Sequence, residues 1–310
     1  MIESVGTPGL WAAFLAFVLV MLALDLGVFN RRAHTPGVLE AGIWTAVWIA
    51  LAAAFNVWIW LAFGRTAGLE FATGYVVEKA LSIDNIFVFL VLFRSLSVPP
   101  EHQHRVLFWG ILGALVTRGI FIVAGTALLA SFHWILYVFG GFLVLTGVKL
   151  LLQKEVEPHP ERNILVRAFM RIYPTTSDYR GGRFLVVENG RRYATPLLVA
   201  VVAAEATDVV FATDSIPALF AITRDPFIVF TSNIFAILGL RALYFVLRGM
   251  MDRFRYLKLG LASVLIFVGG KMVAEDVLPI DVVTSLVVIL GLVGLSIAAS
   301  LARPAAPPAA

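Results

Sequence analysis

Long apolar runs alternate with short polar segments along almost the whole chain. The runs reach about 20 residues, which is the length that a helix needs to cross the hydrocarbon core of a bilayer. The pattern therefore predicts an all-α, polytopic helical membrane protein. We place its nine spans at about residues 10–29, 43–63, 71–93, 106–130, 133–152, 196–222, 227–247, 257–275 and 282–302.

One polar insert interrupts this pattern, at about residues 153–195 between the fifth and sixth spans. It is charged and contains Gly181-Gly182, and we expect a short hairpin there. The tail at residues 303–310 is rich in Ala and Pro and is expected to be disordered. Residues 1–310 then form a single transmembrane domain in which the insert is a cytoplasmic loop.

The composition supports a membrane protein, because 60% of the residues are hydrophobic and the mean hydropathy is +0.91. The chain has no cysteine, which excludes disulfides and thiolate metal sites. A pI of about 9.5 is also typical of nucleic-acid-binding proteins. The basic residues flank the spans, however, so we expect the lipid bilayer as partner and no nucleic acid. Residues 1–9 lack a basic region, so we expect no cleavable signal peptide.

Charge is distributed unequally between alternate loops. One set of loops holds most of the 24 Lys and Arg residues, whereas the other set holds only Arg65 and Arg224. Cytoplasmic loops of membrane proteins carry the excess of positive charge. We therefore expect a multi-pass protein of the cytoplasmic (inner) membrane, with the N-terminus outside and the C-terminus in the cytoplasm.

Two acidic segments inside the spans match each other. They cover residues 78–86 in the third span and 208–216 in the sixth, and both read acid, five residues, Asp, Asn or Ser, then Ile. Carboxylates at membrane depth are costly, so a matched pair indicates a built site. Each helix groups part of its polar side chains on one face, namely Glu78, Ser82 and Asn85 in the third span, and Glu205 and Asp208 in the sixth span.

The matching continues through the helices that follow. Spans three to five, at residues 71–152, and spans six to eight, at residues 196–275, each contain an acidic helix, a helix with one Arg and a Gly-rich helix with one Lys. A three-helix unit that is repeated at once must enter the membrane in the opposite direction the second time. This indicates an inverted repeat, as in secondary transporters. The corresponding basic residues are Arg118 and Arg241, and Lys149 and Lys271.

The basic residues inside the spans are expected to be counter-ions of the carboxylates. A charge at the centre of a span costs roughly 2.5–3.5 kcal/mol on insertion scales, so few can stay unpaired. The alternative is that each charge only joins neighbouring helices. For Arg118 and Arg241 we predict an ion pair with a buried carboxylate. The full set of candidate counter-ions is Lys79, Arg118, Lys149, Arg241 and Lys271.

The candidate ligands are all hard oxygen atoms, which suit Mg²⁺, Ca²⁺ and Mn²⁺ but do not distinguish among them. Pro217 removes a backbone donor, so we expect a break in the sixth span near Thr213-Asp214-Ser215, with a simple kink as the alternative. Four carboxylates are expected to converge between the third and sixth spans, with Asn85, Ser82 and Ser215 beside them and with Asp25 and Glu205 as second choices. The four are Glu78, Asp84, Asp208 and Asp214.

These motifs resemble the signatures of the TerC family of integral membrane proteins, over about residues 15–300. Residues 78–85 resemble the first signature of the family and residues 205–218 resemble the second. Asp25 resembles a further acidic position in the family's first span. The resemblance implies a helical transporter related to the LysE superfamily, with Mn²⁺ efflux as in the Alx-type members. The family is named after tellurite resistance, but a carboxylate-rich site should repel that oxyanion.

Three functions are compatible with these features. The leading hypothesis is an exporter of divalent metal ions, Mn²⁺ first, in exchange for protons, with no permanently bound cofactor. The second is a carrier of Ca²⁺ or another cation. The third is a non-transport membrane partner that supplies metal to secreted proteins or acts in tellurite or envelope stress resistance, through membrane partners that the sequence does not identify. An enzyme is not expected, because the chain has no nucleophile elbow, phosphate loop or HExxH helix.

Overall fold

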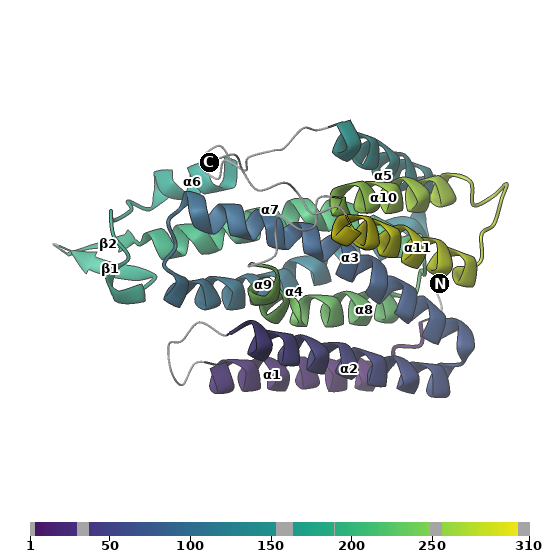
Figure 1. The fold of residues 1–310 in the computed structure, drawn as a ribbon, viewed down its shortest axis with the longest axis horizontal. Coiled ribbons are helices and arrows are strands. Elements are labelled where there is room, and N and C mark those ends of the chain that lie inside the picture. The colour runs from purple at the N-terminus through teal and green to yellow at the C-terminus, as the bar shows by residue number, and fades with distance from the viewer. Residues whose placement is uncertain (1–3, 30–36, 153–163, 189, 249–255, 303–310) are drawn as a thin grey trace.

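The computed structural model describes residues 4–29, 37–152, 164–188, 190–248 and 256–302, and it is almost entirely helical (Figure 1). The helices before the polar insert are α1 (Pro8–Phe29), α2 (Val38–Phe63), α3 (Arg65–Ser95), α4 (Pro100–Ser131) and α5 (Ile135–Leu152). The insert contains α6 (Ile164–Ile172), the 3-10 turn η2 (Arg180–Gly182), β1 (Leu185–Glu188) and β2 (Arg191–Ala194). The helices after it are α7 (Pro196–Phe220), α8 (Pro226–Leu238), α9 (Leu240–Leu247), α10 (Leu257–Val273) and α11 (Val282–Ala302).

Each predicted span falls on a helix or on a bent pair of helices. Among the described residues, five helices are long and apolar enough to cross a membrane, namely α2, α4, α5, α7 and α11, and the pair α8–α9, bent by 40°, would be a sixth. Helix α10 has only 17 residues, and α3 carries charged residues along its length. The structure thus confirms a helical membrane protein, whereas the predicted count of nine spans is not confirmed and the orientation of the termini stays a prediction.

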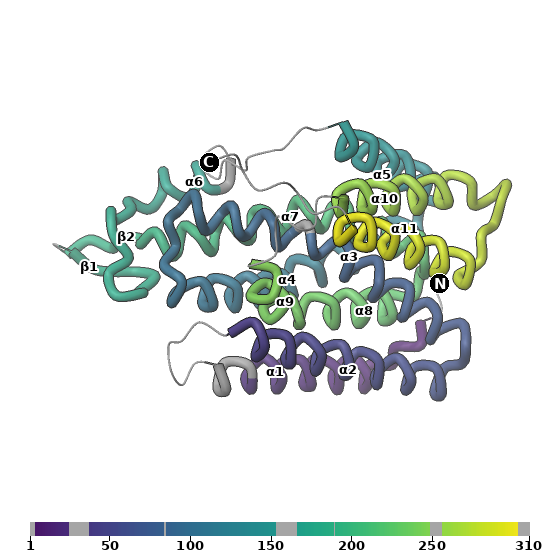
Figure 2. Tube along the Cα trace, viewed as in Figure 1, coloured from purple at the N-terminus to yellow at the C-terminus, as the bar shows by residue number. Residues whose placement is uncertain are grey.

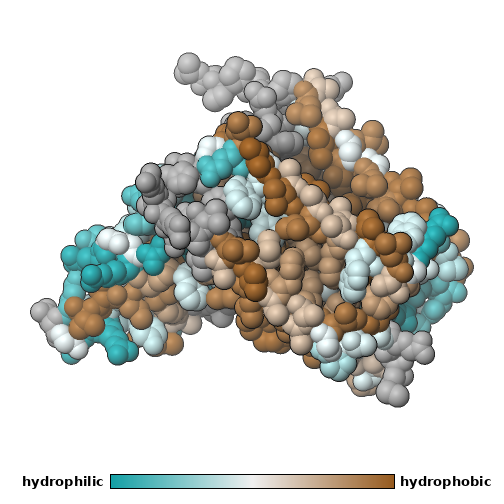
Figure 3. Space-filling model, turned by 90° about the horizontal axis from the view of Figure 1, so that it is seen from below, coloured by the Kyte–Doolittle hydropathy of each residue, from teal (hydrophilic) through white to brown (hydrophobic). Residues whose placement is uncertain are grey.

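An apolar surface surrounds the middle of the molecule. Large hydrophobic side chains such as Leu19, Leu61, Val123 and Leu152 are exposed. Figure 3 shows hydrophobic residues over the middle of one face and hydrophilic residues gathered at the end that carries the hairpin. Apolar residues face outwards in this way where the surrounding solvent is lipid.

The polar insert forms the predicted short hairpin, in which β1 and β2 pair antiparallel with Leu185 opposite Ala194. It is attached to the ends of the membrane helices. The Tyr179 hydroxyl donates to the Leu96 carbonyl at 2.6 Å, and Arg105 donates to the Gly182 carbonyl. The segment before the hairpin is thereby joined to the C-terminal end of α3 and to α4, and β2 ends just before the start of α7. The prediction of disorder at residues 303–310 falls outside the described residues.

The two acidic helices run in opposite directions. Helix α3 ends beside the insert and α7 begins there, as the chain trace shows (Figure 2). Helix α4 packs on α7, and α8 packs on α3, while α5 packs on α10. In the predicted repeat α3 corresponds to α7, α4 to α8–α9 and α5 to α10. This correspondence turns the α4–α7 contact into the α8–α3 contact and leaves the α5–α10 contact unchanged. This contact pattern is what an inverted repeat with a pseudo-two-fold axis requires.

Small residues bring α5 and α10 together around this axis. A Cβ atom on Gly140 would lie 2.8 Å from the Gly269 carbonyl oxygen, and one on Gly269 would lie 2.6 Å from the Gly140 carbonyl oxygen. A Cβ on Gly147 would lie 2.8 Å from the Ala262 carbonyl oxygen. When Lys149 is matched to Lys271, Gly147 corresponds to Gly269 and Gly140 to Ala262. The two contacts are then equivalent, as expected of close small-residue packing between membrane helices.

The break in the helix lies elsewhere than predicted. Helix α7 is continuous through Pro217, so the expected break near Thr213 does not form. The helix ends at Phe220, so the backbone bond that Pro217 removes belongs to its final turns. The bend instead separates α8 from α9, at Gly239.

Candidate functional site

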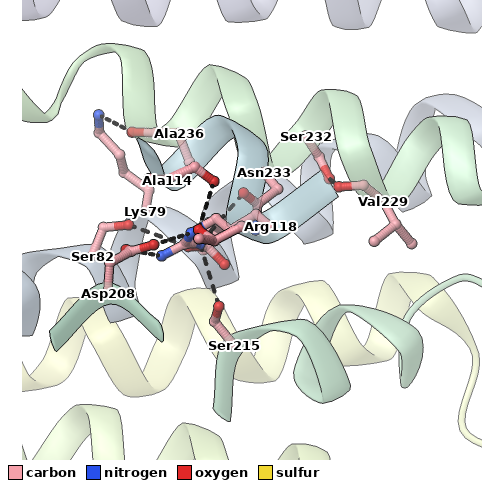
Figure 4. A network of polar contacts seen from close by, with 12 residues as sticks. Lys79, Ser82, Ala114, Arg118, Asp208, Ser215, Val229, Ser232, Asn233 and Ala236 are labelled. Atoms are coloured by element: carbon pink, nitrogen blue, oxygen red, sulfur yellow. Dashed lines mark hydrogen bonds and ion pairs between the residues drawn. The ribbon is translucent and has the colours of Figure 1, made fainter. Parts of the chain in front are cut away.

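Arg118 lies at the centre of the helix bundle and its side chain is completely buried. Its guanidinium forms an ion pair with Glu78 on α3. It forms a second ion pair with Asp208 on α7 (Figure 4). The Nη2–Oδ1 distance to Asp208 is 2.9 Å, and Nε donates to Oδ2 of the same carboxylate at 3.4 Å. One cation therefore binds one carboxylate from each of the two predicted repeat units, which is the position that a counter-ion takes.

Two neutral groups also contact the Arg118 guanidinium. Nη1, which binds Glu78, lies 3.3 Å from the Ser215 hydroxyl and 3.3 Å from the Asn233 side-chain oxygen. Asn233 is on α8 and is fully buried. Sequence reasoning did not select it, although a lone Asn inside an apolar span is a detectable signal. The α4 arginine thus contacts acceptors from three other helices.

The polar face predicted for α3 is present. Glu78, Ser82 and Asn85 are all buried, and the Ser82 hydroxyl donates to the Glu78 carboxylate at 3.5 Å. Asp84 follows on the same helix, but its side chain lies outside the described residues, as does that of Asp25 on α1.

Glu205 lies one turn before Asp208 and also faces α4. Its carboxylate is packed so tightly against Gly113 that any Cβ at that position would collide with it. Its Oε1 atom is buried and has no hydrogen-bond partner among the described residues. The same is true of Glu78 Oε2 and Asn233 Nδ2. Buried polar atoms without partners are rare in proteins and indicate a ligand or a second conformation.

Asp214 faces a different part of the bundle. It is partly buried and accepts a hydrogen bond from the Thr146 hydroxyl on α5 at 3.3 Å. The structure thus brings Glu78, Asp208 and Ser215 together around Arg118, whereas Asp214 is directed towards α5. The side chain of Asp84 lies outside the described residues, so the convergence of all four carboxylates stays a prediction.

The other basic residues have different surroundings from Arg118. Lys79 donates to the Ala236 carbonyl on α8 at 3.1 Å, and Lys271 donates to the Ser285 hydroxyl on α11 at 3.0 Å. Arg241 is buried in the first turn of α9. Lys149 differs from the prediction of a buried counter-ion, because it is exposed in the last turn of α5. Its flexible side chain can extend from there to the membrane surface.

The centre is acidic even with Arg118 in place. With both carboxylates ionised, Glu78 and Asp208 exceed the guanidinium by one negative charge. Within the described ranges, no group of three or more His, Cys, Asp or Glu side chains is arranged to hold a metal ion. Arg118 itself stands between the two carboxylates. Hard oxygens from α3 and α7 would face a cation there only if the guanidinium moved away.

Comparison with known proteins identifies the group to which these features correspond. The sequence model described as "Integral membrane protein TerC family" matches residues 63–306. A membrane protein of Myxococcus xanthus, uncharacterized and named STKORF319, is 57% identical over 300 residues, which cover 97% of this chain and 94% of the relative. No solved structure matches the chain.

The relative from Escherichia coli K12 is provisionally named membrane-bound redox modulator Alx. It is 46% identical over 299 residues, which cover 94% of this chain and 93% of that protein. A membrane protein of Rickettsia bellii is 38% identical over 293 residues. All three relatives match along nearly their full length.

Proposed function

The chain belongs to the TerC family of integral membrane proteins, and we propose that it exports divalent metal ions from the cytoplasm, Mn²⁺ first, in exchange for protons. The observation that carries this proposal is the buried centre around Arg118. Carboxylates from the two predicted repeat units bind the same guanidinium there, and one oxygen of Glu78 has no hydrogen-bond partner among the described residues. Such a centre is costly at membrane depth, which supports a role in moving ions.

The chemistry of the centre favours a hard divalent cation. Every candidate ligand is a carboxylate, hydroxyl or amide oxygen, and the chain has no cysteine. Oxygen ligands suit Mn²⁺, Mg²⁺ and Ca²⁺, whereas thiolates and imidazoles suit softer ions. Ca²⁺ is therefore the main competitor of Mn²⁺ as substrate. Among the described residues, Oε1 of the nearby Glu205 carboxylate is buried without a hydrogen-bond partner. This supports proton exchange, because a carboxylate can carry a proton in one state and face a cation in another.

The name of the Escherichia coli relative suggests a redox role as an alternative. Redox modulators commonly act through thiolates, and this chain has none of its own. A role in metal supply to secreted proteins remains the non-transport alternative. It predicts no ion movement by the purified chain alone.

Transport by purified protein in lipid vesicles tests the proposal. We expect Mn²⁺ to enter the vesicles faster when a pH gradient is imposed, and cells that express the chain should contain less Mn and tolerate more of it. Asp208→Asn removes one charge of the centre and should abolish uptake. Glu275→Gln is the matched control, because that carboxylate lies in an exposed ion pair with Arg224.

Failure has a clear signature. If the wild-type chain moves no Mn²⁺ or Ca²⁺ into vesicles while it is monodisperse and folded, the transport proposal is wrong. If Asp208→Asn transports Mn²⁺ like Glu275→Gln at equal protein level, the ion pathway does not use the Arg118 centre. Competition between Mn²⁺ and Ca²⁺ in the same vesicles decides the preferred ion.

A further inference from the structure

We propose that Arg118 is an exchangeable occupant of the ion site, a cation on a tether that the transported ion displaces from Glu78 and Asp208. The guanidinium then rests on Ser215 and Asn233, and it returns when the ion leaves. This inference rests on the proposed transport of a divalent cation through the same centre. It assigns Arg118 a role in ion release and Asn233 a role as its second docking point.

The contacts of the guanidinium provide both positions. In the described state Nη1 binds Glu78 and at the same time lies 3.3 Å from Ser215 Oγ and from Asn233 Oδ1. The neutral acceptors are therefore already beside the nitrogen that has to leave the carboxylate. At Nη1, a small movement of the side chain exchanges Glu78 for two neutral acceptors, so that nitrogen is not left without a partner. Nη2 and Nε, which bind Asp208, give up that carboxylate to the arriving ion.

The charges explain why a tethered cation is needed. Two carboxylates that are buried side by side repel each other and lose their hydration, so an empty centre would be costly. Arg118 neutralises one of the two charges whenever no ion is bound. A site that always contains a cation can release its ion without passing through the empty state.

The same balance selects for ionic charge. A monovalent ion that displaced the guanidinium would only replace the single positive charge that the guanidinium had supplied to the two carboxylates. Arg118 contacts both Glu78 and Asp208 but carries one positive charge, whereas a divalent ion carries two and neutralises both carboxylates. Competition with a permanently charged guanidinium therefore disfavours Na⁺ and K⁺ relative to Mn²⁺ or Ca²⁺.

Two atoms without partners are suited to this exchange. Glu78 Oε2 is buried and has no hydrogen-bond partner among the described residues, although the other oxygen of that carboxylate binds Arg118. It is thus available for first contact with an arriving ion. Asn233 Nδ2 is also without a partner in the described state, so its amide is not fixed in one orientation by that group.

Mn²⁺ binding to purified protein distinguishes an exchangeable arginine from a fixed structural one. In Arg118→Gln the competitor is removed, so the dissociation constant for Mn²⁺ should fall by at least about tenfold. Transport in vesicles should nevertheless be lost, because nothing displaces the bound ion. Arg118→Lys keeps a tethered cation and should bind Mn²⁺ more weakly than Arg118→Gln. Arg224→Gln, which removes an exposed arginine, is the control for charge alone.

A second variant keeps the test decisive if Arg118→Gln does not fold. Asn233→Leu keeps the approximate size of the side chain and removes the second docking point. The guanidinium should then stay on the carboxylates, and Mn²⁺ should bind several-fold more weakly, the opposite direction to Arg118→Gln. Wild-type Mn²⁺ affinity in folded Asn233→Leu, or equal or weaker binding in folded Arg118→Gln, would overturn the exchange.

The outcomes separate the two proposals. If wild-type protein transports Mn²⁺ and the variants do not shift affinity in opposite directions, the transport proposal stands and the exchange of Arg118 is wrong. If wild-type protein neither binds nor transports Mn²⁺ or Ca²⁺, the proposed function fails and the exchange fails with it.

Discussion

The packing of α5 against α10 makes a sharp prediction about four glycines. Gly140 and Gly269 lie at the closest contact of the two helices, whereas Gly141 and Gly270 are their immediate neighbours and have no heavy atom within 4 Å of the Cβ that they would gain. We expect Gly140→Ala and Gly269→Ala to destabilise the protein, and Gly141→Ala and Gly270→Ala to leave it equally stable or more stable.

The magnitude follows from the contact distances. The new Cβ in Gly269→Ala would lie 2.6 Å from the Gly140 carbonyl oxygen and 2.8 Å from the Leu143 Cβ. A carbon normally stays about 3.3–3.6 Å from a carbonyl oxygen, so the two backbones must separate by roughly 0.7–1 Å. A gap of that size costs the neighbouring contacts about a quarter to a half of their dispersion energy. Overpacking of this kind costs about 1–3 kcal/mol.

The neighbouring glycines isolate this cost. Replacement of Gly by Ala inside a helix gains about 0.5–1 kcal/mol whether or not the position is crowded. This gain cancels when the stability of Gly269→Ala is compared with that of Gly270→Ala. The remaining difference in stability is the cost of overpacking alone, about 1–3 kcal/mol. The same holds for Gly140→Ala against Gly141→Ala.

Thermal stability in detergent is the direct assay. Purified variants are heated, and the fraction that remains folded and monodisperse is measured by gel filtration. We expect the midpoints of Gly140→Ala and Gly269→Ala to fall below those of their neighbours by similar amounts, because each new Cβ would approach the carbonyl oxygen of the other glycine, at 2.8 Å and 2.6 Å. Equal midpoints for Gly269→Ala and Gly270→Ala would show that α5 and α10 do not pack as described.

Two further predictions concern single positions. Gly113→Ala should displace the Glu205 carboxylate, which would collide with the new methyl group, and should reduce Mn²⁺ transport in vesicles. Gly110→Ala, whose nearest contacts are at 4.0 Å, should transport Mn²⁺ normally. Equal loss of transport in both variants would contradict a specific contact between Gly113 and Glu205. Asp225→Ala should lower the thermal midpoint by the equivalent of about 1–3 kcal/mol, because Asp225 caps α8 and also binds Ser4 and the Val5 amide. Ser4→Ala removes only one of these hydrogen bonds, so it should cost less, and a larger effect of Ser4→Ala would refute this account of the cap.

The helices and the centre of the site were predictable because both follow from the cost of polar groups in lipid. Uninterrupted apolar runs have few alternatives to helices in a bilayer, so their positions could be read from hydropathy. The same cost indicated that Glu78 and Asp208 need a cation. Arg118 was a natural candidate, since it follows on the next span and has a charge that cannot be lost.

The features in which the structure differs from the sequence-based prediction depend on tertiary contacts. Pro217 breaks nothing because α7 ends three residues later, a boundary that sequence alone does not fix. Lys149 is far enough along α5 for its side chain to escape burial. Asn233 becomes important only because α8 packs on α4 beside Arg118. The bend at Gly239 also depends on tertiary packing, because the sequence does not identify the residues that lie beside Gly239.

The centre combines a symmetric pair of carboxylates with an asymmetric cation. Glu78 and Asp208 occupy corresponding positions of the two predicted repeats, and the contacts of the helices that carry them exchange as such a repeat requires. Arg118 belongs to one half only, and its counterpart Arg241 is on α9, beyond the bend at Gly239.

An ion between the carboxylates would meet similar ligands from both sides of the membrane. The arginine makes the two sides unequal, because its neutral acceptors are contributed by α7 and α8 of the second half. If the chain transports ions as proposed, the direction of transport depends on which helices hold the guanidinium when the ion arrives.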